Sequence, residues 1–194
     1  MSTLEVNTIT PQSGTTLTLG GSGDTIQIAS GASGLATTNG ITEADQWRIT
    51  TSTTHGENFL VSNWERNDTS FSLIGTGMTQ SSGVFTFPST GIYKVDWSLN
   101  FRIVSNVRVN LAGGYISATT DNSSYFKLAE GYNSVLNVAE DRYLSAHMSA
   151  IFDVTDTSTH KVKFASNATH IDTITQGTSS VNYTYATFIR LGDT

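Results

Sequence analysis

The most regular alternation of hydrophobic and polar positions runs from residue 93 to residue 101. Aromatic or apolar side chains occupy every second position, and polar or charged side chains occupy the positions between them. A period of two over this length predicts an antiparallel strand with one buried face. We expect the apolar set of this strand to form the core of a head domain: Tyr93, Val95, Trp97, Leu99 and Phe101.

Residues 84–87 predict a short strand just before this long one. It ends at Pro88, which has no backbone N–H to donate to a neighbouring strand. Gly91 follows and suits a turn, because a residue without a Cβ takes positive φ angles at little cost.

A second alternation runs from residue 144 to residue 154. Its apolar positions include two alanines and a methionine, so we expect this strand to lie opposite Trp97 and Phe101 across the core. Large and small side chains that face each other in this way fill a sandwich interior to native density. The apolar positions are Leu144, Ala146, Met148, Ala150, Phe152 and Val154.

Strand signals continue through the rest of residues 45–194. They recur about every 8–12 residues, which is typical of a sandwich or a barrel. Helical periodicity is nearly absent, and residues 136–142 are the one short candidate for a helix. A region of about 150 residues can bury a sizeable core, so the sequence predicts an all-β head domain. The further strands expected are 46–51, 58–63, 70–74, 104–111, 115–117, 125–128, 161–165 and 183–191.

Residues 1–40 follow a different, repeated pattern. A Ser-Gly turn at residues 13–14 leads to apolar positions 17 and 19, and the same pattern returns nine residues later. Each unit is too small to bury a core, and two copies fall below the roughly three that a single-chain solenoid needs. We expect a short N-terminal β-shaft or attachment arm that folds only in an oligomer; the alternative is a flexible Gly/Ser/Thr linker. The side chains expected to anchor and oligomerise the arm are Leu4, Val6, Ile9, Leu17, Leu19, Ile26 and Ile28.

Composition excludes several classes of partner. The net charge is −6 and only ten residues are Lys or Arg, so the sequence predicts no nucleic-acid binding and no attraction to anionic membranes. No apolar run reaches the about 20 residues of a membrane helix, and residues 1–20 do not resemble a signal peptide. The absence of Cys excludes disulfides and thiolate metal sites, and it suits either a cytosolic protein or a particle assembled in a reducing compartment.

Candidate catalytic and metal-binding residues are scattered. The four histidines show no metal-ligand spacing, and we expect no cofactor and no metal site. Asp153, Asp156 and His160 contain the residue types of a triad, but no nucleophile-elbow pattern accompanies them. Asp121 with Asn122 could offer oxygen ligands to Ca²⁺, and an ordinary Asx turn is the favoured alternative.

A glycan hydrolase would need two carboxylates that flank a groove. Glu130, Glu140, Asp141 and Asp153 are available, but their spacing gives no reason to pair them. The sequence therefore predicts no catalytic residues and a protein that is not an enzyme.

Residues 77–97 read GMTQSSGVFTFPSTGIYKVDW. This run resembles the signature of the globular head of complement component 1q and its tumour-necrosis-factor-like relatives, with Gly, an aromatic-Thr pair, Pro, Gly and Tyr at this spacing. Residues 185–191, YATFIRL, resemble the closing strand of that family, whereas TDTST at residues 155–159 replaces its frequent Gly-Asp turn. The resemblance covers residues 45–194 and implies a jelly-roll head that assembles as a trimer through aromatic faces.

The arm carries a second resemblance. Residues 4–20, LEVNTITPQSGTTLTLG, and residues 22–28, SGDTIQI, resemble the N-termini of fibre-like virion proteins of tailed phages, especially marine ones. In those proteins such a segment joins trimeric β-heads to the particle.

Together these patterns predict a non-enzymatic, homotrimeric phage virion protein that is assembled in the host cytoplasm. We expect a tail fibre or short spike for host attachment; the alternatives are a capsid decoration protein and a fibre-borne glycan hydrolase. The expected partners are other copies of the chain, a virion protein that holds the arm, and a host surface glycan or protein. Polar, Gly-rich loops at residues 53–58, 75–83 and 118–124 are candidate contact loops, because such connections carry function.

Overall fold

The computed structural model describes residues 9–11, 13–15, 21, 23, 40–54, 58–70, 73–104, 108–136 and 140–194. The chain divides into two units, Met1–Thr38 and Asn39–Thr194. In the first unit, residues 13–15 form a bend and the side chain of Ile9 is exposed. The other residues predicted to anchor the arm lie outside the described residues, so the shaft stays a prediction: Leu4, Val6, Leu17, Leu19, Ile26 and Ile28.

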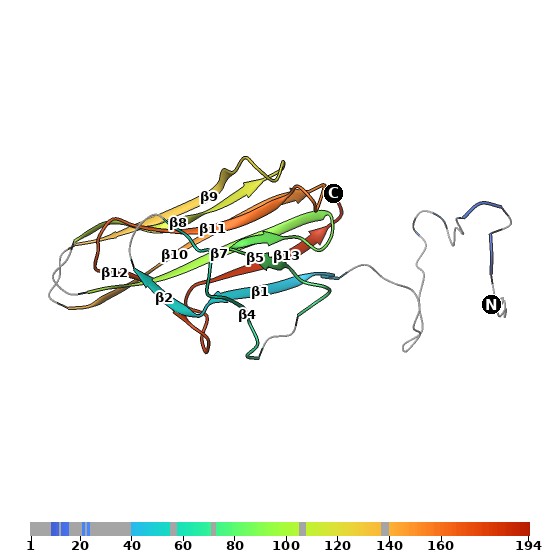
Figure 1. The fold of residues 1–194 in the computed structure, drawn as a ribbon. Helices are drawn as coiled ribbons and strands as arrows, with labels where there is room; N and C mark the ends of the chain where they lie inside the picture. Colours follow the sequence, from blue (N-terminus) through green and yellow to red (C-terminus); the bar gives the residue numbers. More distant parts are fainter. Residues whose placement is uncertain are drawn as a thin grey trace. The chain divides into compact units, whose positions relative to one another are not determined.

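The described part of the second unit contains strands and no helix (Figure 1). The strands are β1 (Ala44–Ile49), β2 (Thr51–Thr54), β3 (Asn58–Phe59), β4 (Trp64–Arg66), β5 (Thr79–Ser81), β6 (Val84–Thr86), β7 (Gly91–Ile103), β8 (Val109–Thr119), β9 (Phe126–Val135), β10 (Arg142–Val154), β11 (Lys161–Ala168), β12 (Thr173–Thr178) and β13 (Tyr185–Gly192).

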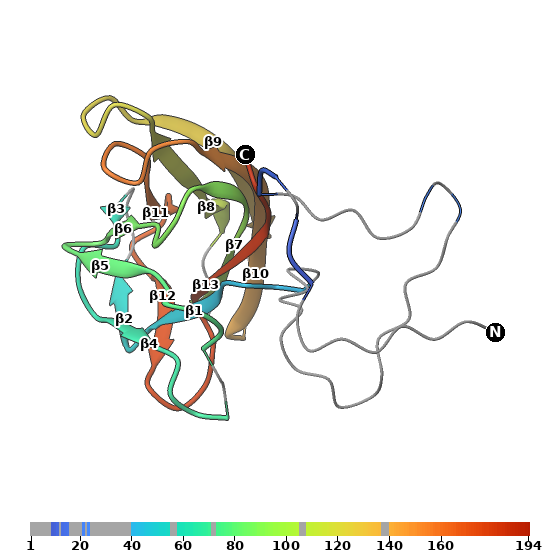
Figure 2. The same cartoon turned by 90° about the vertical axis from the view of Figure 1, so that its right-hand side faces the viewer.

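The strands form two antiparallel sheets, which we call sheet A and sheet B. In sheet A, β7 pairs with β10 along one edge and with β13 and β12 along the other; β1 pairs with β13, β4 with β1, and β2 with β12. Sheet B has the order β5-β6-β11-β8-β9, with β3 beside β11. Figure 2 shows the two layers from one end of the strands.

The chain crosses between the sheets at most of its connections. The links that join one sheet to the other are β2–β3, β3–β4, β4–β5, β6–β7, β7–β8, β9–β10, β10–β11 and β11–β12. Two packed antiparallel sheets with these crossings form a jelly roll. The structure therefore confirms the predicted all-β jelly-roll sandwich.

The alternating face of β7 lies against sheet B. Trp97 has no exposed surface, and its Nε1–H donates a hydrogen bond to the backbone oxygen of Ala165 on β11 at 3.1 Å. Its ring packs on Phe164, with 5.0 Å between ring centroids. The structure places all five predicted core residues in this interior: Tyr93, Val95, Trp97, Leu99 and Phe101.

The second alternating strand does not lie where we expected it. β10 is the neighbour of β7 within sheet A, with Ala146 beside Leu99 and Met148 beside Trp97. The layer opposite β7 contains β11 instead. Alternation identifies the buried face of a strand but not its neighbours, so the prediction of a facing strand was wrong.

Two smaller predictions were also wrong. Leu136 and residues 140–142 are not helical, because Arg142 already begins β10 and pairs with Ile103. In the described part of 70–74, the only pairing is an isolated bridge between Ala44 and Ile74.

The two ends of the sandwich carry different connections. The chain enters from residue 40 at the end that also carries the β6–β7, β8–β9 and β10–β11 links, which we call the entry end. The β7–β8, β9–β10 and β11–β12 links lie at the opposite, far end, whereas the β12–β13 link lies beside the middle of β7, where Tyr185 pairs with Ser98. Of the candidate contact loops, residues 75–78 and 118–124 lie at the entry end, whereas Thr54 pairs near the far end. These loops therefore do not form one surface.

Candidate functional site

The outward face of sheet A is the best candidate for a binding surface. The pairing of β7 with β10 sets Tyr143 beside Arg102, His147 beside Ser98, and Ile151 beside Lys94. Ile151 is 66% exposed, and Tyr143 is exposed to a similar degree. Large apolar side chains on the solvent-facing side of a sheet indicate a place where another molecule binds and covers them.

Strand β13 widens this face on the other side of β7. Its half-buried Tyr185 lies beside Ser98, and its half-buried Ile189 lies beside Lys94. We call the outward side chains of β10, β7 and β13 the sheet A surface. Sequence reasoning missed it, because the prediction assigned β10 to the opposite layer.

Charges on the sheet A surface are neutralised locally. Lys94 Nζ lies 2.8 Å from Asp96 Oδ2, and Arg102 Nη2 lies 2.6 Å from Asp141 Oδ2. The hydrogen bond with Asp141 raises the pKa of Arg102, so this guanidinium stays charged. A surface with paired charges can meet a second copy of itself without like-charge repulsion.

Two oxygens of the sheet A surface are buried and have no hydrogen-bond partner among the described residues. They are Oδ1 of Asp96 and Oδ1 of Asn100, on outward positions of β7 that flank Ser98. Buried polar atoms in folded proteins nearly always have a partner, so an unpaired one requires an explanation. A covering surface with donor groups would supply those partners.

Ser98, His147 and Asp96 come together within this face. Ser98 Oγ lies 2.9 Å from His147 Nδ1, and His147 Nε2 lies 3.8 Å from Asp96 Oδ1. Acyl transfer would also need free backbone N–H donors beside the serine to bind an oxyanion. Ser98 lies in the middle of β7, whose backbone pairs with β10 on one side and β13 on the other. The trio therefore orients an imidazole within the surface but lacks the parts of a hydrolase.

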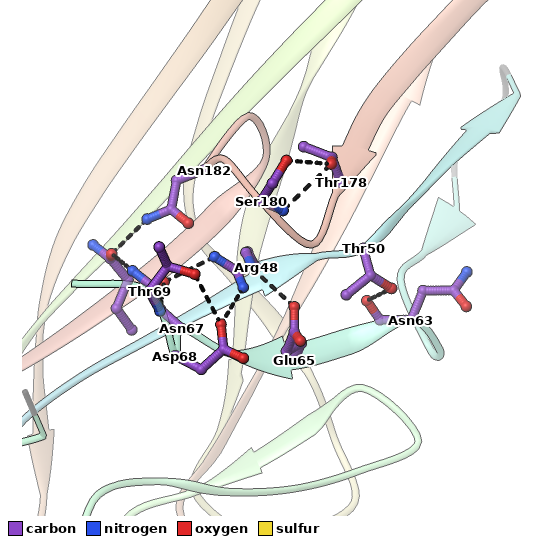
Figure 3. A network of polar contacts seen from close by, with 11 residues as sticks. Arg48, Thr50, Asn63, Glu65, Asn67, Asp68, Thr69, Thr178, Ser180 and Asn182 are labelled. Atoms are coloured by element: carbon purple, nitrogen blue, oxygen red, sulfur yellow. Dashed lines mark hydrogen bonds and ion pairs between the residues drawn. The ribbon is translucent and has the colours of Figure 1, made fainter. Parts of the chain in front are cut away.

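A second polar cluster surrounds Arg48 on β1 (Figure 3). Arg48 is 1% exposed; its Nε donates to Glu65 at 2.9 Å, and its Nη1 donates to Asn67 Oδ1 at 2.9 Å. Its remaining nitrogen bonds Asp68, whose pKa is lowered chiefly by the hydroxyl of Thr69. A buried guanidinium with several acceptors fixes the segment that follows β4.

The same cluster holds a second loop. The amide groups of Asn67 and Asn182 both donate to Oε1 of Gln46, at 2.9 and 2.6 Å. Figure 3 shows Asn182 in the loop that also carries Ser180 and Thr178. The cluster therefore positions two loops. Its one sequence signal is an arginine between Trp47 and Ile49 in a strand that is otherwise apolar there.

Two aspartates considered in the sequence as candidate ligands or catalytic groups accept hydrogen bonds within their own turns. Asp121 Oδ1 accepts hydrogen bonds from the backbone N–H groups of Ser123 and Ser124 at 2.8 and 2.7 Å, and these bonds lower its pKa strongly. It forms the Asx turn that was the alternative to a Ca²⁺ site. Asp156 likewise accepts from the backbone of Ser158. In the described ranges, no three His, Asp or Glu side chains gather to hold a metal ion.

The four carboxylates considered for glycan hydrolysis do not form a pair. Glu130 bonds Lys127 at 2.9 Å, Asp141 bonds Arg102, and Glu140 lies 3.8 Å from Arg142. Asp153 is exposed at the entry end of β10, beside Ile92. The described residues contain no helix long and apolar enough to span a membrane.

No protein-family model matches the sequence, and no curated protein matches it. Solved structures share its fold. The chain is similar to murine APRIL at pH 5.0, with 15% identity and a TM-score of 0.55 over 77% of this chain and 98% of that one. It is also similar to Eiger TNF from S. frugiperda, with 14% identity and a TM-score of 0.56 over 78% and 93% of the two chains. At these identities the likeness establishes a tumour-necrosis-factor-like jelly-roll fold and nothing further.

Proposed function

We propose that this chain is a non-enzymatic, homotrimeric surface protein of a phage virion, a tail fibre or short spike that attaches the particle to its host. The observation that carries the proposal is the sheet A surface. It combines exposed apolar side chains, internally paired charges and two buried oxygens that have no hydrogen-bond partner in the described part of the chain. Such a surface is suited to a permanent contact with identical copies.

The number of copies and the virion location come from the sequence resemblances. The head signature implies three copies, and the arm motif implies attachment to a particle through residues 1–40. Three heads around one axis present three identical sets of loops, so contacts that are weak singly gain from multivalency.

The far end of the head is the proposed host-contact surface. The chain enters the head at the opposite end, so the far-end loops lie away from the point where residues 1–40 join it. These loops present two large apolar side chains to solvent, Leu136 and Ile171. Exposed apolar side chains on polar loops are typical of contact residues.

Immunogold labelling of intact particles with an antibody against residues 45–194 tests this function. We expect gold at the tail tip or collar. Gold spread over the capsid would overturn host attachment and support the alternative, a capsid decoration protein whose head clamps neighbouring capsomers. Particles without gold would overturn the virion assignment.

A further inference from the structure

Lysines are concentrated on the outward face of sheet B. The chain has four lysines, and three of them, Lys127, Lys161 and Lys163, lie on this face. The fourth, Lys94, lies on sheet A and is paired with Asp96. In a chain with a net charge of −6, this face is a local concentration of positive charge.

Lys163 is held between two aromatic rings. Its Nζ lies 3.8 Å from the ring centroid of Phe59 and 3.9 Å from that of Tyr125. In the described part of the chain it has no carboxylate partner, and burial lowers its pKa. Ring faces attract the ammonium but offer no oxygen acceptors, so its N–H donors can still bind an anion.

A second cation and a third ring adjoin Lys163. Lys127 Nζ lies 4.6 Å from the ring centroid of Tyr115, and the Tyr115 ring packs edge-on against Phe59 at 5.5 Å. Lys127 also bonds Glu130, a carboxylate that can accept hydrogen bonds from hydroxyl groups. We call Phe59, Tyr115, Tyr125, Lys127 and Lys163 the lysine–aromatic surface.

A pocket of about 190 Å³ borders this surface. Phe59 lines it together with Thr53, Thr54 and Ser62, so three hydroxyl-bearing residues meet one aromatic ring there. Hydroxyl groups beside a ring suit a ligand that has both polar and C–H surfaces.

We infer that the lysine–aromatic surface binds an acidic carbohydrate, whose carboxylate or sulfate group pairs with Lys163 and whose C–H faces lie against the aromatic rings. A nucleic acid is disfavoured because the surface has too few cations to neutralise a run of phosphates. The inference rests on the proposed attachment function, since it adds a second host-contact surface to the far-end loops and names the class of ligand that this surface binds.

Binding of the full chain to three immobilised polysaccharides tests the inference. The probes are polygalacturonate, which carries carboxylates, dextran sulfate, which carries sulfates, and neutral dextran. We expect the protein to bind one or both acidic polymers and not dextran, and the binding to weaken as salt rises.

Lys163→Met and Lys161→Met form a matched pair of variants. Both remove one lysine charge from β11, but only Lys163 belongs to the lysine–aromatic surface, since Lys161 Nζ donates to the backbone oxygen of Thr157. We expect Lys163→Met to weaken acidic-polymer binding about tenfold and Lys161→Met to leave it nearly unchanged. Methionine keeps the unbranched apolar stem between the rings, and Tyr125→Ala is a second variant that should weaken binding without a change of charge.

Absence of binding to both acidic polymers would overturn the inference, as would equal losses in the two lysine variants. Neither result would affect the proposed attachment function, because the immunogold experiment tests that function separately by locating the protein on the particle. Conversely, suppose that binding to an acidic polymer depends on Lys163 and that the gold label is spread over the capsid. These two results together would support the inferred binding surface and overturn the attachment function.

Discussion

Trp97 is the residue on which the head core depends most. It is fully buried and contacts aromatic rings from β4 and β11. Its indole N–H donates a hydrogen bond to the backbone oxygen of Ala165. We expect Trp97→Ala to lower the free energy of unfolding by about 3–5 kcal/mol, because it removes apolar contacts and leaves a cavity. Urea denaturation measures the loss.

Exposed Val61 provides the control for Trp97. Val61→Ala removes apolar atoms from a position between β3 and β4 that is already in solvent, and it should change the free energy of unfolding by less than about 0.5 kcal/mol. Equal urea midpoints for the two variants would contradict the claim that the stability of the head depends on the packing of Trp97.

Asp121 makes head stability depend on pH. Its pKa is lowered below the ordinary value of 3.8 because two backbone N–H groups and the hydroxyl of Thr119 bind its charged form. A lowered pKa in the folded state adds stability that is complete above the ordinary value and is lost as the pH falls toward the lowered one. We expect the wild type to melt above Asp121→Ala at pH 7, with a smaller difference at pH 2.5.

Ser123→Ala is the control, because Ser123 donates to Asp121 through its backbone and not its side chain. Its melting temperature relative to wild type should not change with pH. If the difference in melting temperature between wild type and Asp121→Ala is the same at both pH values, the charge of the carboxylate does not stabilise the turn.

At the scale of elements, the sheet A surface predicts which strand mediates assembly. Ile151 on β10 and Ile171 in the β11–β12 loop are both 66% exposed, but only Ile151 lies on that surface. We expect Ile151→Lys to disrupt the oligomer, because it places an unpaired charge in an apolar contact. Light scattering should give three times 20.8 kDa for the wild type and for Ile171→Lys, and 20.8 kDa for Ile151→Lys.

A wild-type chain that is monomeric would contradict the assembly proposal itself. An Ile151→Lys variant that keeps the wild-type mass would instead show that β10 lies outside the contact.

Sequence patterns identified strands better than they identified the neighbours of each strand. The alternation around Trp97 fixed its buried face, because burial of one face leaves a period of two in the chain. The place of β10 beside β7 depends on hydrogen bonds between distant residues, which leave no periodic signal. Short polar strands such as β2 and β5 were missed for a related reason: their residues are mostly exposed, so burial imposes no pattern on them.

The candidate surfaces were harder still to predict. The sheet A surface needs the partners of β7 on both edges, and the lysine–aromatic surface needs β3, β11 and β9 in one layer. A lysine such as Lys163 reads as an ordinary polar position until Phe59 and Tyr125 are placed beside it.

At the scale of the whole molecule, the two units of the chain should be separable. Unit Asn39–Thr194 contains both sheets and the whole described core, since β1 begins at Ala44. Its stability therefore comes from contacts among its own strands, and a chain without residues 1–38 should fold. We expect this truncated chain to melt cooperatively within a few degrees of the full chain, with the same β-sheet circular dichroism.

The truncated chain also separates folding from anchoring. If residues 1–38 hold the protein on the particle, the truncated chain should be absent from purified particles although its head is intact, because no segment remains to bind a virion protein. The full chain expressed alongside it gives the reference for incorporation, and a blot with antibody against residues 45–194 detects both by size. Equal incorporation of the two chains would move the anchor from the arm to a surface of the head, and the sheet A surface would then be the first place to search for it.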